Sequence, residues 1–459
     1  MKLRVPHTPI RVPGFRFAGV RCGLKENRKR DIGLIASDVP AVAAGAFTTN
    51  RVKAAPVIIG LERLAGGRLQ AIVVNSGNAN AYTGRNGLTV ARAMCAVVAR
   101  ELRIDEQLVI PSSTGRIGVP LPRRTVESGA RAACRQLSPD GFHAALEGMM
   151  TTDAFPKFAA DGLVIDGREV VIAGMTKGAG MIAPKMTPTG GAHATNLTYV
   201  LTDAAVSVSA LRRVLQVALP QSFNAIVVDG DTSTNDTIVL MANGVARNPR
   251  LTPAARGFPA FCGAVTRLLT SLARMIVKDG EGATKVIDIR VHGARSVRDA
   301  ERVADAIARS PLCKTAFFGG RPVRRTDRLR RRIQWRRVRS RQAGRLPRRR
   351  PGGAPRPRGR QPHRAPRHGR RAPAGIHPDH APARRRRRRP SDHVGSQPGL
   401  RALQLRVSDM SSGWPIGDHR GSANRVDRPS SSRANKWISE CTRSDPGRAR
   451  TAHRRYRSL

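Results

Sequence analysis

Short apolar runs and segments of helical periodicity alternate along the first 318 residues of the chain. Residues 69–74 (LQAIVV) and 225–228 (AIVV) are apolar runs that end at Asn or Asp, as buried strands do. Residues 90–102 and 297–310 place apolar side chains at helical spacing, and the second segment stops just before Pro311, where a helix is expected to break. This pattern predicts a globular α/β protein.

The pattern disappears after Gly320. The segment RRTDRLRRRIQWRRVRSRQAG has neither the period of about 2 typical of strands nor the period of about 3.6 typical of helices, and few of its side chains are Leu, Ile, Val or Phe. A segment with so little apolar surface cannot offset the entropy that it would lose on ordering. We therefore predict that residues 321–459 form a disordered tail.

The net charge of +50 is concentrated in this tail, which holds 41 of the 82 Lys and Arg residues and only 8 of the 32 acidic ones. The tail is a nucleic-acid-binding segment, a generic disordered segment, or a segment translated out of frame. Nucleic-acid-binding tails mix Lys with Arg, or repeat RGG or RS units with aromatic residues. Here 40 of the 41 basic residues are Arg. Since Arg, Pro, Gly and Ala have GC-rich codons, we favour out-of-frame translation, in which case the charge indicates no partner.

Cysteine spacing and hydropathy predict the compartment. The six cysteines are far apart and form no CxxC pair, which argues against a zinc ribbon or a disulfide framework and fits a reducing cytosol. The N-terminal sequence MKLRVPHTPIRVPGFRF lacks the apolar core of a signal peptide, and no later stretch approaches the roughly 18 apolar residues of a membrane span. We predict a soluble, cytoplasmic protein.

Five clusters of Gly, Asn, Ser and Thr follow apolar runs, where a rigid scaffold presents polar groups and open backbone N–H donors. A single cluster of this kind is more often a turn than a site, but five in one chain favour a site built from hydroxyls and backbone amides. The clusters are residues 75–84 (NSGNANAYTG), 111–122 (PSSTGRIGVPLP), 176–186 (TKGAGMIAPKM) with 194–205 (ATNLTYVLTDAA), 227–237 (VVDGDTSTNDT) and 275–285 (MIVKDGEGATK).

One cluster imitates a calcium-binding loop, because Asp229, Asp231 and Ser233 alternate along it. An EF-hand loop needs Gly at its sixth position and Glu at its twelfth. This chain has Thr234 and Leu240 there. We therefore predict a hydrogen-bonded turn and no metal site.

Acyl chemistry without a His/Cys pair still needs a nucleophile and a base. A threonine at a chain terminus provides both, because its own α-amino group, with a pKa of about 8, accepts the hydroxyl proton. An internal threonine becomes terminal only if the peptide bond before it is cut. The bond between Ala194 and Thr195 is well placed, because a small residue precedes the hydroxyl and a β-rich run, residues 197–202, follows it.

These clusters, in order and spacing, resemble the ornithine acetyltransferase (glutamate N-acetyltransferase) family of arginine biosynthesis. Further segments extend the resemblance over nearly all of residues 14–319. They are GFRFAGVRCGLK near the start, SDVPAVAAGAFTTNRVKAAPV (residues 37–57), MTTDAFPK (residues 150–157) and SPLCKTAFFG (residues 310–319).

The resemblance implies a set of site residues and a division of the chain. The family cleaves itself between Ala and Thr, which implies an α chain of residues 1–194 and a β chain of residues 195–320 that begins with the nucleophile. The implied oxyanion hole is Thr114 and Gly115. The implied substrate-binding residues, among which Lys177 would hold a carboxylate and Glu281 an ammonium group, are Thr151, Thr152, Lys177, Thr195 and Glu281.

The implied reaction is ping-pong acetyl transfer from N2-acetylornithine to glutamate through an acetyl-threonine intermediate, without a metal or bound cofactor. The resemblance leaves open whether acetyl-CoA also serves as a donor. The implied fold has two β-sheets layered between helices, with an N-terminal-nucleophile-like, self-processing architecture, and the implied assembly is an (αβ)₂ heterotetramer. Alternatives are a related self-processing amidase or aminopeptidase, an arginine-rich nucleic-acid binder, and an inactive frameshifted product.

The chain departs from the family pattern at two places. Residues 187–193 (TPTGGAH) are inserted between Met186 and Ala194, and Thr187 becomes a rival for the nucleophile. We favour Thr195, because the downstream L-x-x-V-x-T-D-A spacing starts from it. After KTAFFG the family continues with x-D-P-N-W-G-R, and this chain has GRPVRR. A frameshift there would remove roughly the last quarter of the enzyme, including substrate-binding Asn and Thr residues.

Overall fold

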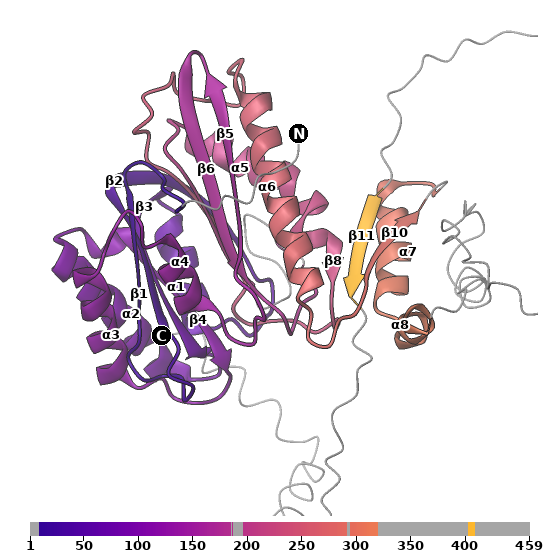
Figure 1. Cartoon of the computed structure of the whole chain (residues 1–459), viewed down its shortest axis with the longest axis horizontal. Helices are drawn as coiled ribbons and strands as arrows, with labels where there is room; N and C mark the ends of the chain where they lie inside the picture. The colour runs from indigo at the N-terminus through magenta and orange to yellow at the C-terminus, as the bar shows by residue number, and fades with distance from the viewer. Residues whose placement is uncertain (1–8, 185, 187–195, 292–293, 320–402, 409–459) are drawn as a thin grey trace, which may run out of the picture. The chain divides into compact units, whose positions relative to one another are not determined.

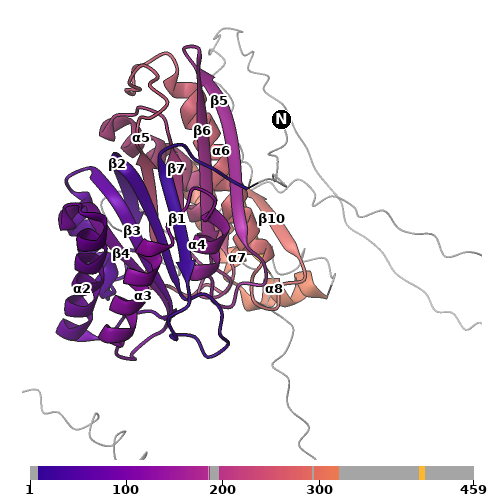
Figure 2. The same cartoon turned by 60° about the vertical axis from the view of Figure 1, so that its left-hand side comes forward.

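A computed structural model describes residues 9–184, 186, 196–291, 294–319 and 403–408 of the chain. The strands form two sheets, both visible in Figure 1, and Figure 2 shows the larger sheet from a second direction. The larger sheet contains β1 (Phe15–Val20), β2 (Ile32–Phe47), β3 (Arg68–Asn78), β4 (Val109–Arg116), β5 (Lys157–Ile165), β6 (Arg168–Lys177), β7 (Leu197–Thr202) and β9 (Thr237–Ala242). The smaller sheet contains β8 (Ile226–Val227), β10 (Val286–Val291) and β11 (Leu403–Ser408).

The larger sheet has the order β4-β3-β2-β9-β7-β6-β5, and β1 pairs with β2 beside this path. The pairs β3–β4 and β7–β9 are parallel, and the other pairs of this sheet are antiparallel. Parallel pairing places the carboxyl ends of β3 and β4 at one edge, with Thr114 opposite Ser76 and Gly115 opposite Gly77. Two of the polar clusters therefore meet there.

Eight α-helices of the described residues flank these strands. They are α1 (Ala55–Leu64), α2 (Gly84–Leu102), α3 (Arg123–Arg135), α4 (Phe142–Met149), α5 (Val208–Ala218), α6 (Phe258–Lys278), α7 (Val297–Ala308) and α8 (Pro311–Phe318). Figure 1 shows α6 alongside β5 and β6. Figure 2 shows α2 beside β3 and β4, while α3 packs against α2, β1 and β2. The structure thus confirms the predicted α/β class, with sheets flanked by helices.

Alternation along β7 shows how the larger sheet is buried on both faces. Val200 joins a core cluster with residues of α5 and α6, such as Leu211 and Leu268. Tyr199, the preceding residue, joins a second cluster with residues of α4 and β1, such as Phe142. Successive side chains of a strand point to opposite faces, so β7 is apolar at both. The larger sheet is therefore covered on both faces at β7.

The predicted elements agree with the structure at most positions. The run at residues 69–74 lies in β3, residues 225–228 contain the two-residue strand β8, and residues 90–102 lie in α2. The helix predicted over residues 297–310 is α7, whose first turn is capped by the Ser296 hydroxyl. Pro311 then begins a separate helix, α8, at a position where its missing N–H costs nothing.

Helix α6 corrects one expectation from hydropathy. By length and composition it is the one helix, within the described ranges, that is long and apolar enough to cross a membrane. The prediction that no stretch approaches such a span was therefore wrong. In the structure 56% of the 18-residue apolar window is buried, and α6 contacts β5, β6 and α5. Its apolar residues thus serve the protein core.

Strand β11 lies in the segment for which the sequence predicts no secondary structure. Its backbone pairs antiparallel with β10 and parallel with β8, so that it occupies the middle of the smaller sheet. The prediction of disorder therefore does not hold for residues 403–408. The rest of residues 321–459, for which the sequence predicts disorder, lies outside the described residues.

Candidate active site

The carboxyl ends of β3 and β4 form one wall of the candidate site. Ser113 donates its hydroxyl hydrogen to Asn75 Oδ1 over 2.6 Å, and both side chains are buried. Asn235, from the cluster of residues 227–237, donates from Nδ2 to the carbonyl oxygens of Ala79 (2.6 Å) and Ser113 (2.8 Å). Side-chain amides thus join three clusters that are distant in the sequence.

Gly115 lies where no other residue fits. Its φ is +134°, outside the range that side chains favour. A Cβ atom at this position would lie 2.3 Å from the carbonyl carbon of Gly77 and 2.5 Å from the backbone nitrogen of Asn78. Thr114, beside it, is 1% exposed. The turn at Thr114 and Gly115 is therefore built by close approach of two backbones.

Lys177 ends β6 and reaches this turn. Its side chain is buried, and Nζ donates a hydrogen bond to Thr114 Oγ1 over 3.1 Å. Burial lowers the pKa of Lys177, while the carboxylates of Asp153, Asp236 and Glu281 act in the opposite direction. The structure therefore brings together a residue predicted for substrate binding, Lys177, and a residue predicted for the oxyanion hole, Thr114.

Asp153 connects the segment of Thr151 with the end of β6. Its carboxylate accepts hydrogen bonds from the backbone N–H groups of Thr151 (2.8 Å) and Gly178 (2.7 Å) and from Lys157 Nζ (2.7 Å). Burial acts to raise the pKa of Asp153, but the charges of Lys177 and Lys157 and these hydrogen bonds outweigh it, so the pKa lies well below its usual range. Asp153 is therefore a buried carboxylate anion.

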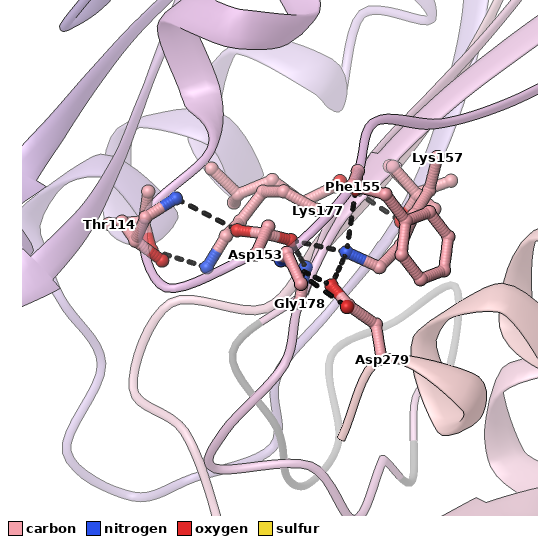
Figure 3. A network of polar contacts seen from close by, with 12 residues as sticks. Thr114, Asp153, Phe155, Lys157, Lys177, Gly178 and Asp279 are labelled. Carbon is pink, nitrogen blue, oxygen red and sulfur yellow. Dashed lines mark hydrogen bonds and ion pairs between the residues drawn. The ribbon is translucent and has the colours of Figure 1, made fainter. Parts of the chain in front are cut away.

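Lys157, the first residue of β5, lies between two carboxylates, as Figure 3 shows. It forms ion pairs with Asp153 and with Asp279, the C-cap residue that follows α6. Asp279 also accepts the backbone N–H of Ala154. Burial raises the pKa of Asp279, although Lys157 opposes this shift. Two segments of the chain, one around Asp153 and one at Asp279, thus meet at one buried ammonium group.

Glu281 lies two residues beyond Asp279 and against the loop that follows β6. Its backbone N–H donates to Ala179 O over 3.1 Å. A Cβ atom on Gly180 would lie 2.8 Å from Glu281 Oε1, so the carboxylate lies directly over this glycine. Glu281 is exposed, as is Thr152, while Thr151 is half-buried. The predicted substrate-binding side chains among the described residues therefore come from three connected segments.

The predicted nucleophile, Thr195, and the predicted cleavage partner, Ala194, lie outside the described residues, as do Thr187 and His193. The residues that flank them are in contact, since Asn196 Nδ2 is 3.9 Å from Met186 Sδ. Asn196 is buried, and its backbone N–H donates to Asp236 Oδ1 over 2.5 Å. Its carbonyl oxygen accepts the Thr237 N–H over 3.0 Å. The start of β7 is thereby fixed to the cluster of residues 227–237.

Lys25 is a residue near this site that sequence reasoning did not single out. Buried Asp31 accepts hydrogen bonds from the backbone N–H groups of residues 22–25 at 2.6–3.2 Å and so shapes their loop. A Cβ atom on Gly77 would lie 3.2 Å from Lys25 Cγ. Burial lowers the pKa of Lys25 to about 8, while Asp31 and Asp153 act to raise it. Lys25 thus lies beside the strand end that Gly115 approaches.

Sequence reasoning also missed Asp153, Lys157 and Asp279, although all three fall within quoted motifs. The signal was available in MTTDAFPK and MIVKDGEGATK, where charged residues stand beside apolar ones. Their pairing required the fold, because Asp279 is more than 120 residues from the other two. The described part of the chain holds no group of three His, Cys, Asp or Glu side chains able to bind a metal ion.

Residues 16–323 match the ArgJ family. The chain is 50% identical over 308 residues to the arginine biosynthesis bifunctional protein ArgJ of Symbiobacterium thermophilum. The aligned residues cover 67% of this chain and 75% of that protein. It is 47% identical over 310 residues to the Geobacter sulfurreducens protein of the same name, and these residues cover 68% of this chain and 77% of that protein.

Among solved structures, ornithine acetyltransferase from Mycobacterium tuberculosis, in complex with ornithine, is 35% identical. That similarity covers 38% of this chain and 94% of the solved chain, with a TM-score of 0.35.

Proposed function

The chain belongs to the ArgJ family, and from this premise we propose that it transfers an acetyl group from N2-acetylornithine to glutamate in arginine biosynthesis. The products would be ornithine and N-acetylglutamate. The observation that carries this proposal is the match of residues 16–323 to the family, with 50% identity to a bifunctional ArgJ protein.

The proposed nucleophile is the hydroxyl of Thr195, freed by cleavage of the Ala194–Thr195 bond. The new α-amine would accept the hydroxyl proton as Oγ attacks the acetyl carbonyl carbon. Collapse of the tetrahedral intermediate would break the amide bond, with the proton passing to the departing ornithine amine. The amine of glutamate would then attack the acetyl-threonine ester and release the Thr195 hydroxyl. Atoms and protons balance over the two half-reactions.

The proposed oxyanion hole is the Thr114 hydroxyl and the Gly115 N–H. The contact between Lys177 and Thr114 supports this role. Because Thr114 Oγ1 accepts a hydrogen bond from Lys177, its own hydrogen is available for the negative oxygen of the intermediate. Donors of this kind stabilise charge that develops only in the transition state.

The proposed substrate-binding residues are Thr151, Thr152, Lys177, Thr195 and Glu281. The buried Lys177 ammonium would bind a substrate carboxylate, and the exposed Glu281 carboxylate would bind the ornithine ammonium group. The contacts through Asp153 and Ala179 support a shared site, because they connect the segments that carry these residues.

Three further proposals concern the acetyl donor, the oligomeric assembly and the cellular compartment. We propose that acetyl-CoA serves as a second acetyl donor, as the word bifunctional in the relatives' names suggests. No bound cofactor enters the proposed reaction. The cleaved chains would assemble as an (αβ)₂ heterotetramer in the cytoplasm.

We propose that the chain as written is impaired in this reaction, because residues after 323 lie outside the family match. The family match ends close to the change in composition at residue 320, which supports a frameshift at this point. The match covers 75% of the Symbiobacterium relative, and the remaining quarter lies outside it. The frameshift interpretation predicts poor solubility and little acetyl transfer for the chain as written, and sequencing the gene around codons 318–325 tests it directly.

The proposed reaction is tested by incubating the protein with N2-acetylornithine, with and without glutamate. Glutamate-dependent formation of N-acetylglutamate supports acetyl transfer. Release of acetate at the same rate in both samples would instead indicate an amidase, in which water accepts the acyl group.

A further inference from the structure

Lys157 is a buried cation whose hydrogen-bonding capacity is fully used inside the protein. Its side chain is 0% exposed. Its Nζ contacts Asp153 Oδ1 (2.7 Å), Phe155 O (3.4 Å) and the carboxylate of Asp279, and it lies 5.1 Å from the centroid of the Phe155 ring. An ammonium group has three donors. None is left for a substrate, so Lys157 acts on the site only through its partners.

The two carboxylates that Lys157 joins belong to different parts of the fold. Asp153 accepts the N–H of Thr151 and the N–H of Gly178, which follows Lys177. Asp279 is the C-cap residue of α6 and stands two residues before Glu281. Its carboxylate also accepts a hydrogen bond from the N–H of Ala154. Figure 3 shows the carboxylates of Asp153 and Asp279 converging on the Lys157 ammonium.

The two carboxylates would repel each other without a cation between them. In a buried environment, this repulsion and the desolvation of each anion are large. If Lys157 were removed, the repulsion would be relieved either by separation of the two segments or by protonation of one of the two carboxylates. In either case the ion pairs that connect the Thr151 segment to the chain leading to Glu281 are lost.

We infer that Lys157 is a positioning residue that holds the segments carrying Thr151, Thr152 and Glu281 at a fixed separation for substrate binding. The inference rests on the proposed function for the identity of the substrates. The ion pairs through which Lys157 connects the two segments do not depend on the proposed function. Self-cleavage is intramolecular and requires no substrate, so it does not depend on this separation.

The test uses the full-length chain with Lys157→Met alone and with the double variant Lys157→Met, Asp279→Asn. The double variant removes the unpaired buried charge at Asp279 and keeps an acceptor for the Ala154 N–H, so it serves if the single variant fails to fold. Arg267→Met is the matched control, because it breaks the exposed Arg267–Asp161 pair, which also joins α6 to β5.

Hydrogen exchange measures how firmly the two segments are held by Lys157. We expect faster amide exchange at residues 151–154 and 279–283 in the double variant and unchanged exchange there in Arg267→Met. The steady-state rates measure the consequence. We expect a higher KM for both glutamate and N2-acetylornithine, a fall in kcat/KM of about 10²-fold, and unchanged self-cleavage. For Arg267→Met we expect changes of no more than about twofold.

Exchange and KM values in the double variant that match those of Arg267→Met would overturn the inference. A lower melting temperature with unchanged KM would show a purely structural pair and would also overturn it. Failure of the proposed function gives a different result, because wild-type protein would then transfer no acetyl group while the exchange difference persisted.

Discussion

Lys177 Nζ lies 3.1 Å from Thr114 Oγ1, and both side chains are buried. A lysine ammonium can only donate, so the Thr114 oxygen accepts and its hydrogen points elsewhere. The contact joins the end of β6 to the turn after β4. A residue proposed for substrate binding thereby contacts a residue proposed for the oxyanion hole.

This contact predicts the effect of changing Thr114. Thr114→Val keeps the shape of the side chain and removes its hydroxyl, so kcat should fall about 10²–10³-fold. Thr114→Ser retains the hydroxyl and should keep most of the activity. The rate of acetyl transfer to glutamate under saturating conditions measures both. Equal activity in Thr114→Val and wild type would remove Thr114 from the oxyanion hole.

Gly115→Ala should abolish acetyl transfer, because the added Cβ would lie 2.3 Å from the backbone of Gly77 and the φ of +134° is unfavourable. Gly118→Ala is the control, since Gly118 also has a positive φ, of +78°, but no atom lies within 4 Å of its Cβ position. It should lose about 1 kcal/mol of stability and keep its activity. Chemical unfolding and acetyl-transfer rates distinguish the two. Comparable activity in both variants would show that the Gly115 backbone can move.

The Lys25 amine should react with acetic anhydride with a midpoint near pH 8, where its pKa lies because of burial. An ordinary lysine has a pKa near 10.5. Competitive labelling across this pH range, read by peptide mass spectrometry, gives the midpoint, and Lys25→Met confirms the assignment. A midpoint near 10.5 would show that the loop shaped by Asp31 leaves Lys25 solvated.

The same shift has a consequence for stability. Between pH 8 and pH 10.5 the unfolded chain holds a proton on Lys25 that the folded chain has released. The contribution of this group to the free energy of unfolding therefore rises as the pH increases through that range. Lys25→Met should remove that rise, which urea unfolding at several pH values would detect.

Much of the fold follows from local patterns in the sequence. The run LQAIVV predicts a buried strand because apolar residues on both faces need cover on both faces, and it forms part of β3. The order and spacing of the polar clusters predict a site at strand ends, and Asn235 joins three of them. Gly115 itself was singled out only through the resemblance to the family.

The missed features depend on contacts between distant segments. Lys157 looks like an ordinary surface residue in MTTDAFPK, and only the arrival of Asp279 explains its burial. Strand β11 was missed because LQLRVS is a short run inside a segment of Arg and Pro, and its pairing with β8 and β10 joins residues more than 100 positions apart. Local periodicity carries no information on such pairs.

Replacing residues 320–459 with the last quarter of the Symbiobacterium relative should raise acetyl transfer by about 10²-fold or more, if substrate-positioning residues lie in the missing part. The chimera and the original chain are compared at equal concentrations of folded protein, measured by circular dichroism. Equal rates would contradict the frameshift interpretation. Salt-dependent binding of RNA by the original chain, lost in the chimera, would instead favour a nucleic-acid-binding tail.

Intact-mass spectrometry of an acetyl-transferring preparation tests the threonine mechanism most directly. We expect two polypeptides separated between Ala194 and Thr195, a single uncut chain in Thr195→Ala, and normal cleavage in Thr187→Ala. An active preparation in which wild-type protein remains one polypeptide would contradict the account, because no α-amine would then stand beside the Thr195 hydroxyl to accept its proton.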